Sequence, residues 1–143
     1  MYREIKFRVW DKDYKRMHTV GDFHHDSLEI DEENNIFFFN LQCIEGSPHK
    51  GINPEECAYR LMQYTGLKDK NGKEIYEEDI LQFYNDVDYI IKPGYAKVVF
   101  KDGAFCCKHF KYGTEYLANM DMSDMDITVV GNIYENPELL EGN

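Results

Sequence analysis

Hydrophobic and polar residues alternate with a period of two in several short stretches of the chain. Residues 5–10 and 80–84 show this alternation, which predicts strands with one buried face. No stretch of ten residues shows a strong period of 3.6, the mark of an amphipathic helix. The pattern therefore predicts a mainly β protein. Strands are expected at 5–10, 16–20, 27–31, 36–41, 58–64, 80–84, 89–91, 96–100, 104–109 and 127–133.

Turn-forming residues separate these stretches and predict short hairpins. Asp102-Gly103 is the clearest case, because an Asp-Gly pair readily adopts the positive φ angles of a tight turn. Pro93-Gly94 predicts another turn, whereas residues 65–73 are polar enough to predict a longer loop. Pro54 and Asn136-Pro137-Glu138 suit the beginnings of short helical turns. Hairpins of this length favour small sheets or partly closed barrels with a few short helical turns.

The irregular stretch 43–58 contains two glycines and two prolines and is the best candidate for a boundary inside the chain. A length of 143 residues suits one domain or two small subdomains. We therefore expect a single domain over 1–143, with two small β subdomains divided near 43–58. The expected core consists of Ile5, Phe7, Val9, Ile36, Phe38, Leu61, Ile80, Val98, Phe100, Phe105, Ile127, Val129 and Ile133.

The chain is acidic, with 16 Lys and Arg against 27 Asp and Glu and a net charge of −11. Non-specific nucleic-acid binding relies on neutralising phosphates, so this balance argues against it for the surface as a whole. The charges are unevenly distributed, because seven acidic residues and no Lys or Arg follow Lys111, while residues 1–16 are locally basic. Such asymmetry suits contact between the two ends, with a second copy, or with another protein.

The expected cellular setting follows from segments that the sequence lacks. No apolar run approaches the roughly 20 residues that a membrane-spanning helix needs. No secretory signal precedes the first strand-like stretch. Adjacent Cys106 and Cys107 would point to opposite faces of a strand and are poor disulfide partners, so free thiols in a reducing compartment are the simpler interpretation. We expect a cytoplasmic protein that does not contact membranes.

Three segments of the chain resemble the YopX family of phage and prophage proteins. They are residues 3–11, 62–80 and 130–140, of which the second is the most specific. The resemblance implies a small β-rich accessory protein of a phage or prophage, in the cytoplasm of a bacterial host. It implies no catalytic residues, because the family has no established activity. Gly66 and Gly131 in these segments are typical of turns and close backbone approaches.

Two groups of residues carry candidate chemistry. The hairpin over 95–112 sets aromatic side chains among lysines, as in small β-barrels that bind single-stranded nucleic acid. Its candidate binding residues are Tyr95, Lys97, Lys101, Lys108, Lys111 and Tyr112. Glu77, Glu78 and Asp79 form a carboxylate triplet that could hold magnesium for a hydrolase. No P-loop, nucleophile elbow or zinc-binding spacing accompanies them, so no cofactor is expected.

A non-enzymatic role through protein contacts, self-association included, accounts best for an acidic β protein without a catalytic motif. The identity of the partner is not indicated by the sequence. The alternatives are single-stranded nucleic-acid binding through 95–112 and metal-dependent hydrolysis at 77–79.

Overall fold

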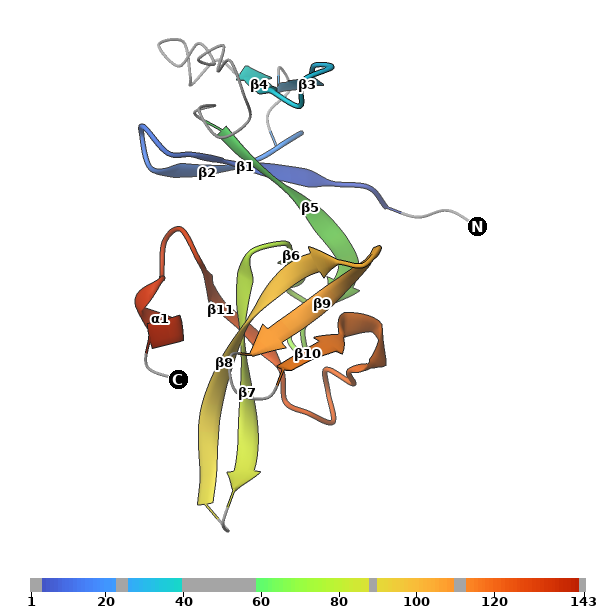
Figure 1. Cartoon of the computed structure of the whole chain (residues 1–143), viewed down its shortest axis with the longest axis vertical. Helices are drawn as coiled ribbons and strands as arrows, with labels where there is room; N and C mark the ends of the chain where they lie inside the picture. The colour runs from blue at the N-terminus through green and yellow to red at the C-terminus, as the bar shows by residue number, and fades with distance from the viewer. Residues whose placement is uncertain (1–3, 23–25, 40–58, 88–89, 110–112, 142–143) are drawn as a thin grey trace. The chain divides into compact units, whose positions relative to one another are not determined.

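The computed structural model describes residues 4–22, 26–39, 59–87, 90–109 and 113–141 (Figure 1). These ranges consist mainly of antiparallel strands, with one 3-10 helix and one four-residue α-helix, so the predicted mainly β fold is confirmed. The chain forms two compact units, an N-terminal unit over Ile5–Gln63 and a C-terminal unit built mainly on Tyr64–Asn143. The whole of the predicted boundary at 43–58 lies outside the described residues, and that division stays a prediction. No helix in the described ranges is both long and apolar enough to cross a membrane.

The N-terminal unit contains two hairpins and the beginning of a longer strand. Its elements are β1 (Phe7–Asp11), β2 (Arg16–Thr19), β3 (Ser27–Ile30), β4 (Ile36–Phe39) and the first half of β5 (Tyr59–Lys68). β1 pairs with β2 on one side and with β5 on the other, while β3 pairs with β4. Asp11 shapes the β1–β2 turn, because its Oδ1 accepts hydrogen bonds from the backbone N–H groups of Asp13 and Tyr14 at 3.0 and 3.1 Å.

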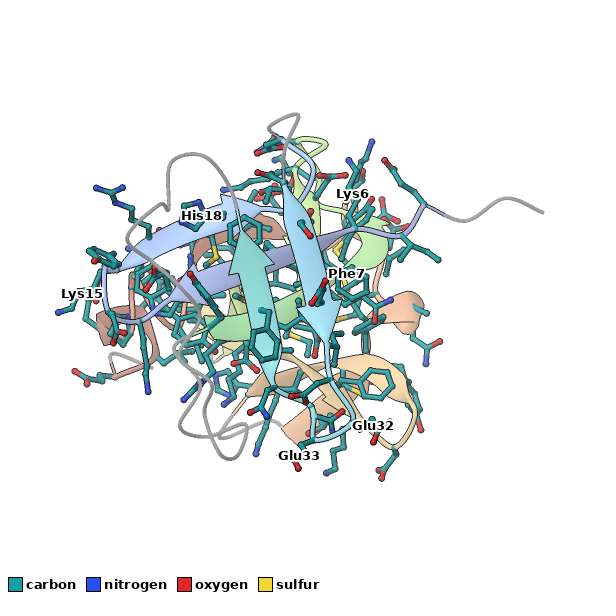
Figure 2. The ribbon with its side chains drawn as sticks, turned by 90° about the horizontal axis from the view of Figure 1, so that it is seen from above. Lys6, Phe7, Lys15, His18, Glu32 and Glu33 are labelled. Carbon is teal, nitrogen blue, oxygen red and sulfur yellow. The ribbon has the colours of Figure 1, made fainter. Side chains whose placement is uncertain are left out.

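A small aromatic core holds this unit together. Val9, Ile36, Phe38 and Tyr59 are buried against one another. The Phe38 ring meets Tyr59 edge-on, with centroids 6.1 Å apart, and lies 5.2 Å from the imidazole of His18. Figure 2 shows His18 on β2, with the β3–β4 hairpin that carries Phe38 nearby. The buried His18 therefore has a packing role in this core.

The C-terminal unit is built on one five-stranded sheet in the order β10-β9-β8-β7-β11. Its elements, besides the second half of β5, are β6 (Glu74–Tyr76), β7 (Asp79–Val87), β8 (Ile90–Lys101), β9 (Ala104–His109), β10 (Gly113–Tyr116), η1 (Leu117–Asn119), β11 (Thr128–Asn132) and α1 (Glu138–Glu141). The second half of β5 pairs with β6. The buried core of the unit consists of Ile75, Leu81, Ala96, Val98, Cys107, Leu117 and Ile127.

The turn predictions had mixed outcomes. Asp102 and Gly103 join β8 to β9 with φ angles of 53° and 79°, as the hairpin prediction requires. The prediction of a turn at Pro93-Gly94 was wrong, because both residues lie inside β8. Pro93 stands opposite Tyr84 in a stretch where β8 pairs with β7 and not with β9. A proline is tolerated there, because its missing N–H can fall on the side without a partner strand.

Two connections are more regular than the sequence indicated. The predicted loop over 65–73 is reduced to a turn at 69–73, because β5 runs on to Lys68 and pairs with Glu74 at the start of β6. The strand β10 was not predicted at all. Its four residues are exposed and show no hydrophobic alternation, so its pairing with β9 has no local signal.

The predicted core is largely confirmed, with two errors. Buried members are Val9, Ile36, Phe38, Ile80, Val98 and Ile127, and half-buried members are Phe7, Leu61, Phe105, Val129 and Ile133. Ile5 is 58% exposed, because it precedes the first residue of β1 that pairs with a neighbour. Phe100 is 57% exposed, because it lies next to the β8–β9 turn, where it packs against Phe105 alone among the described aromatic rings.

The core position of Cys107 predicts an unreactive thiol. Burial, followed by the neighbouring Cys106, raises the pKa of Cys107 to about 12 from an ordinary value of 9.0. Iodoacetamide at pH 8 should leave Cys107 unmodified in the native protein and should modify it in urea, as peptide mass mapping can measure. The folded state holds this proton more tightly than the unfolded state, so its stabilising effect should be lost as the pH rises from about 9 to about 12. Equal labelling of native and unfolded Cys107 would contradict this account.

Candidate functional site

The turn between β5 and β6 is organised by one buried carboxylate. Asp69 Oδ1 accepts hydrogen bonds from the N–H groups of Asn71 and Lys73 at 2.8 and 2.9 Å, and its Oδ2 accepts one from Val129 at 2.9 Å. The turn is thus tied to β11, which lies sixty residues later in the chain. The ammonium of Lys70 also forms an ion pair with Asp126, whose hydrogen bond and charge raise the pKa of Lys70. The side chains of Asp69, Lys70 and Asp126 therefore have structural roles in this turn.

Polar side chains between β11 and α1 also form hydrogen bonds that stabilise the local backbone. Asn132 Oδ1 accepts hydrogen bonds from the N–H groups of Tyr134 and Glu135 at 3.0 and 2.9 Å. The Asn136 side chain accepts a hydrogen bond from the N–H of Asn132 and lies against the α-carbon of Gly131. A side chain at Gly131 would overlap Asn136. This glycine is therefore required by a close approach within the turn.

An apolar hollow in the C-terminal unit is the candidate functional site. It has a volume of about 320 Å³ and lies among the second half of β5, the start of β9, the end of β10 and η1. Its lining residues are Thr65, Leu67, Ala104, Phe105, Tyr116, Leu117, Ala118 and Asn119. None of these described residues is acidic, basic, histidine or cysteine. The Thr65 hydroxyl is already used, since it donates to the Ile75 carbonyl at 2.7 Å and accepts from the Leu67 N–H. The hollow is suited to apolar contact, and the Tyr116 phenol is the one titratable group among its described lining residues.

Aromatic side chains extend the apolar surface beyond the hollow. Tyr116 is 51% exposed at the end of β10. Phe105 lines the hollow and packs edge-on against the exposed Phe100, with ring centroids 5.2 Å apart. Beside Tyr116, the Glu115 carboxylate accepts hydrogen bonds from the Tyr116 N–H at 3.0 Å and from the Asn119 amide at 3.4 Å. The Glu115 carboxylate therefore already accepts the hydrogen bond of one backbone N–H group of β10, that of Tyr116.

The sequence did not reveal this hollow. Its residues come from three separate segments, and Leu67 falls in a stretch that was predicted to be a polar loop. The pair Tyr116-Leu117 was the one local signal, because it is an apolar pair outside every predicted strand.

The predicted nucleic-acid-binding residues lie largely on one face of the sheet. Lys97 on β8 stands directly opposite Lys108 on β9. Tyr95 and Lys101 alternate onto the same face, since they lie two residues before and four residues after Lys97. Lys111 and Tyr112 lie outside the described residues.

The carboxylate triplet does not form a described metal site. Asp79 is buried, and its Oδ2 accepts a hydrogen bond from the Tyr76 N–H at 2.8 Å. Glu78 has a φ of 67°, and its backbone bonds to Val98 and Ile133. Across the described ranges, no three His, Cys, Asp or Glu side chains are grouped as metal ligands. Glu77, Glu78 and Asp79 form a tight backbone turn, and the hydrolase hypothesis stays a prediction.

Comparison with known proteins places the chain in a family. The family model described as "YopX protein" matches residues 6–141. The chain belongs to the YopX family. The resemblance of its three segments to that family is thereby confirmed. No curated protein matches the chain.

Two solved structures of full-length similarity support this membership. The protein yopX from Bacillus subtilis is 27% identical, with a TM-score of 0.63, and the match covers 96% of this chain and 97% of that one. Protein EF1440 from Enterococcus faecalis is 28% identical, with a TM-score of 0.60 and coverage of 97% and 99%. The YopX-like segments 62–80 and 130–140 include the Asp69 turn and the Asn132 turn, and both have the structural explanations given above.

Substitution of Asp69 should destabilise the fold strongly. Asp69→Ala leaves three backbone N–H groups without their carboxylate acceptor, and the free energy of unfolding should fall by about 3 kcal/mol or more. Urea unfolding measures this loss. Asp121→Ala is the matched control, because Asp121 also accepts two backbone hydrogen bonds but is exposed, so water replaces it at a cost of about 1 kcal/mol or less. Equal losses in the two variants would contradict the proposed role of Asp69.

Gly131→Ala should also destabilise the protein, by about 2 kcal/mol, because the new methyl group overlaps the Asn136 side chain. The double variant Gly131→Ala/Asn136→Ala removes that overlap. Its free energy of unfolding should therefore fall by less than the sum of the two single losses. Strict additivity of the two substitutions in urea unfolding would show that the overlap is not the cause.

Proposed function

We propose that this YopX-family protein is a non-enzymatic protein-binding module whose hollow receives an apolar side chain of a partner protein. The observation that carries the proposal is the open hollow with the exposed aromatic rings of Phe100 and Tyr116 near it. Apolar surface of this kind is characteristic of interaction sites, where a few large side chains anchor a partner. The absence of acidic, basic, histidine or cysteine side chains among the described lining residues supports binding over catalysis.

The mode of binding follows from the strand beside the hollow. β10 is an edge strand of the sheet, so a partner strand could in principle pair with it. The Glu115 carboxylate, however, already accepts the Tyr116 N–H at the end of β10 next to the hollow. Insertion of one or two apolar side chains avoids competition with that hydrogen bond. The partner is therefore a segment with a large apolar anchor, and main-chain pairing is secondary.

The biological setting in this proposal is that of a phage or prophage accessory protein in the cytoplasm of a bacterial host. The support is the family resemblance, together with a chain whose described residues contain no membrane-spanning helix. A second copy of the chain is an alternative occupant of the hollow. Light scattering over a concentration series distinguishes the two occupants. Self-association would raise the molar mass with protein concentration, and the hollow substitutions that abolish partner binding would also abolish that rise.

The test compares a substitution at the hollow with a matched one elsewhere. Ala118 is exposed and lines the hollow, so Ala118→Arg places a charge there without disturbing the core. Tyr116→Ala removes a 51% exposed ring at the hollow, and Tyr14→Ala removes a 52% exposed ring in the other unit. A protein captured from host cells should lose affinity by about thirtyfold with either hollow variant and should be unaffected by Tyr14→Ala.

Calorimetry with the purified partner completes the experiment. Burial of the apolar hollow should give a negative heat-capacity change on binding. A partner that binds both hollow variants as tightly as the wild type would overturn the proposal. A small apolar compound that occupies the hollow, with no protein partner lost in the variants, would overturn it in favour of a ligand site.

A further inference from the structure

The face of the five-stranded sheet opposite the core residues Ala96 and Val98 carries three lysines. Lys97 and Lys108 are direct cross-strand partners, and Lys101 follows on the same face of β8. Like charges directly opposite each other on a sheet are destabilising. None of the three lysines forms an ion pair with any residue that the structure describes. Although the net charge of the chain is −11, no carboxylate of the described ranges is paired with these three cations.

Two tyrosines continue the same face at the other end of β8. Tyr95 precedes Lys97 by two residues and stands opposite Gln82, whose amide lies 3.5 Å from the Tyr95 hydroxyl. Tyr84 follows Gln82 by two residues and is therefore the diagonal neighbour of Tyr95. Tyr84 is 49% exposed and Tyr95 is half-buried. Part of each tyrosine side chain is therefore accessible to a flat partner.

One carboxylate in the segment beside this end of the face is paired with a lysine. The pairing of Thr128 with Gln82 brings the chain just before β11 alongside the part of β7 that carries Tyr84. Asp126 in that segment is paired with the ammonium of Lys70. An anion approaching Tyr84 would thus meet an ion pair instead of an isolated negative charge.

We propose that the tyrosine–lysine stripe formed by Tyr84, Tyr95, Lys97, Lys101 and Lys108 binds single-stranded nucleic acid without sequence preference. From Tyr95 to Lys101 the stripe is about 20 Å long, at about 3.3 Å per strand residue. That length matches about six nucleotides at a stacked spacing of about 3.4 Å. The lysines neutralise phosphates and the tyrosines stack on bases. An acidic protein segment would satisfy the lysines but would leave the rings without a planar partner.

The expected salt dependence follows from the number of lysines. Three neutralised phosphates give a slope of log K against log salt of about −2 for a single strand. The acidic remainder of the surface weakens binding further, so the measurement belongs at low ionic strength. The full chain is titrated into a fluorescent oligothymidine of about 12 nucleotides, and anisotropy is followed from about 20 to about 200 mM salt.

The decisive variants remove charge or stacking from the stripe. Lys97→Thr/Lys108→Thr should reduce the slope to about −0.7, because one phosphate contact remains. Lys68→Thr/Lys73→Thr is the matched control, because it removes the same charge from exposed lysines of the β5–β6 hairpin and should keep the slope near −2. Tyr84→Ala should weaken binding about tenfold with the slope unchanged. Thermal unfolding of each variant verifies that it is folded.

Three outcomes would overturn the proposal. The first is an identical slope in the stripe variant and its control. The second is loss of affinity with the lysine substitutions but not with Tyr84→Ala, combined with displacement of the oligonucleotide by polyglutamate, which would assign the stripe to an acidic protein partner. The third is no binding at the lowest salt. Lys97→Thr/Lys108→Thr should leave capture of the protein partner by the hollow unchanged, so failure of the hollow and failure of the stripe are distinguishable.

Discussion

Buried side chains that accept backbone N–H groups hold the C-terminal unit together, and Asp69 is the main example. A buried amide without an acceptor costs free energy, and this carboxylate satisfies three of them in two segments far apart in the chain. The turn between β5 and β6 is thereby attached to β11, which pairs with β7 at one edge of the main sheet. Thr65 and Leu67 of β5 line the hollow, so this attachment helps to hold one wall of the hollow in place.

The two proposed binding surfaces lie at different places on that sheet, the hollow at the start of β9 and the end of β10 beside η1, and the stripe along β8. Phe105 and Cys107 on β9 point toward the core, and Phe105 reaches the hollow. Lys108, between Cys107 and His109, points the other way. The hollow is apolar and lies among β5, β9, β10 and η1, while the stripe is cationic and runs along β8. An acidic protein can thus keep a local cationic stripe, because strand alternation separates it from the core side of the sheet.

Key polar and glycine residues of the YopX-like segments stabilise the backbone geometry of turns. Asp69 and Asn132 each serve two or more backbone donors, and Gly131 leaves room for Asn136. These residues of the family segments fix how the chain turns, and Thr65 and Leu67 of segment 62–80 also line the proposed hollow.

The sequence by itself determined the strand-rich class, the Asp102-Gly103 hairpin and most of the core, because alternation and turn chemistry are local properties. It also placed four of the six nucleic-acid candidates on one strand pair. Only the tertiary structure decided that Pro93 lies within a strand, that β10 exists, and that Phe100 is exposed. The tertiary structure also decided the hollow, because the hollow forms only where β5, β9 and η1 come together. Such features depend on which segments become neighbours, and a local pattern carries no information about neighbours distant in the chain.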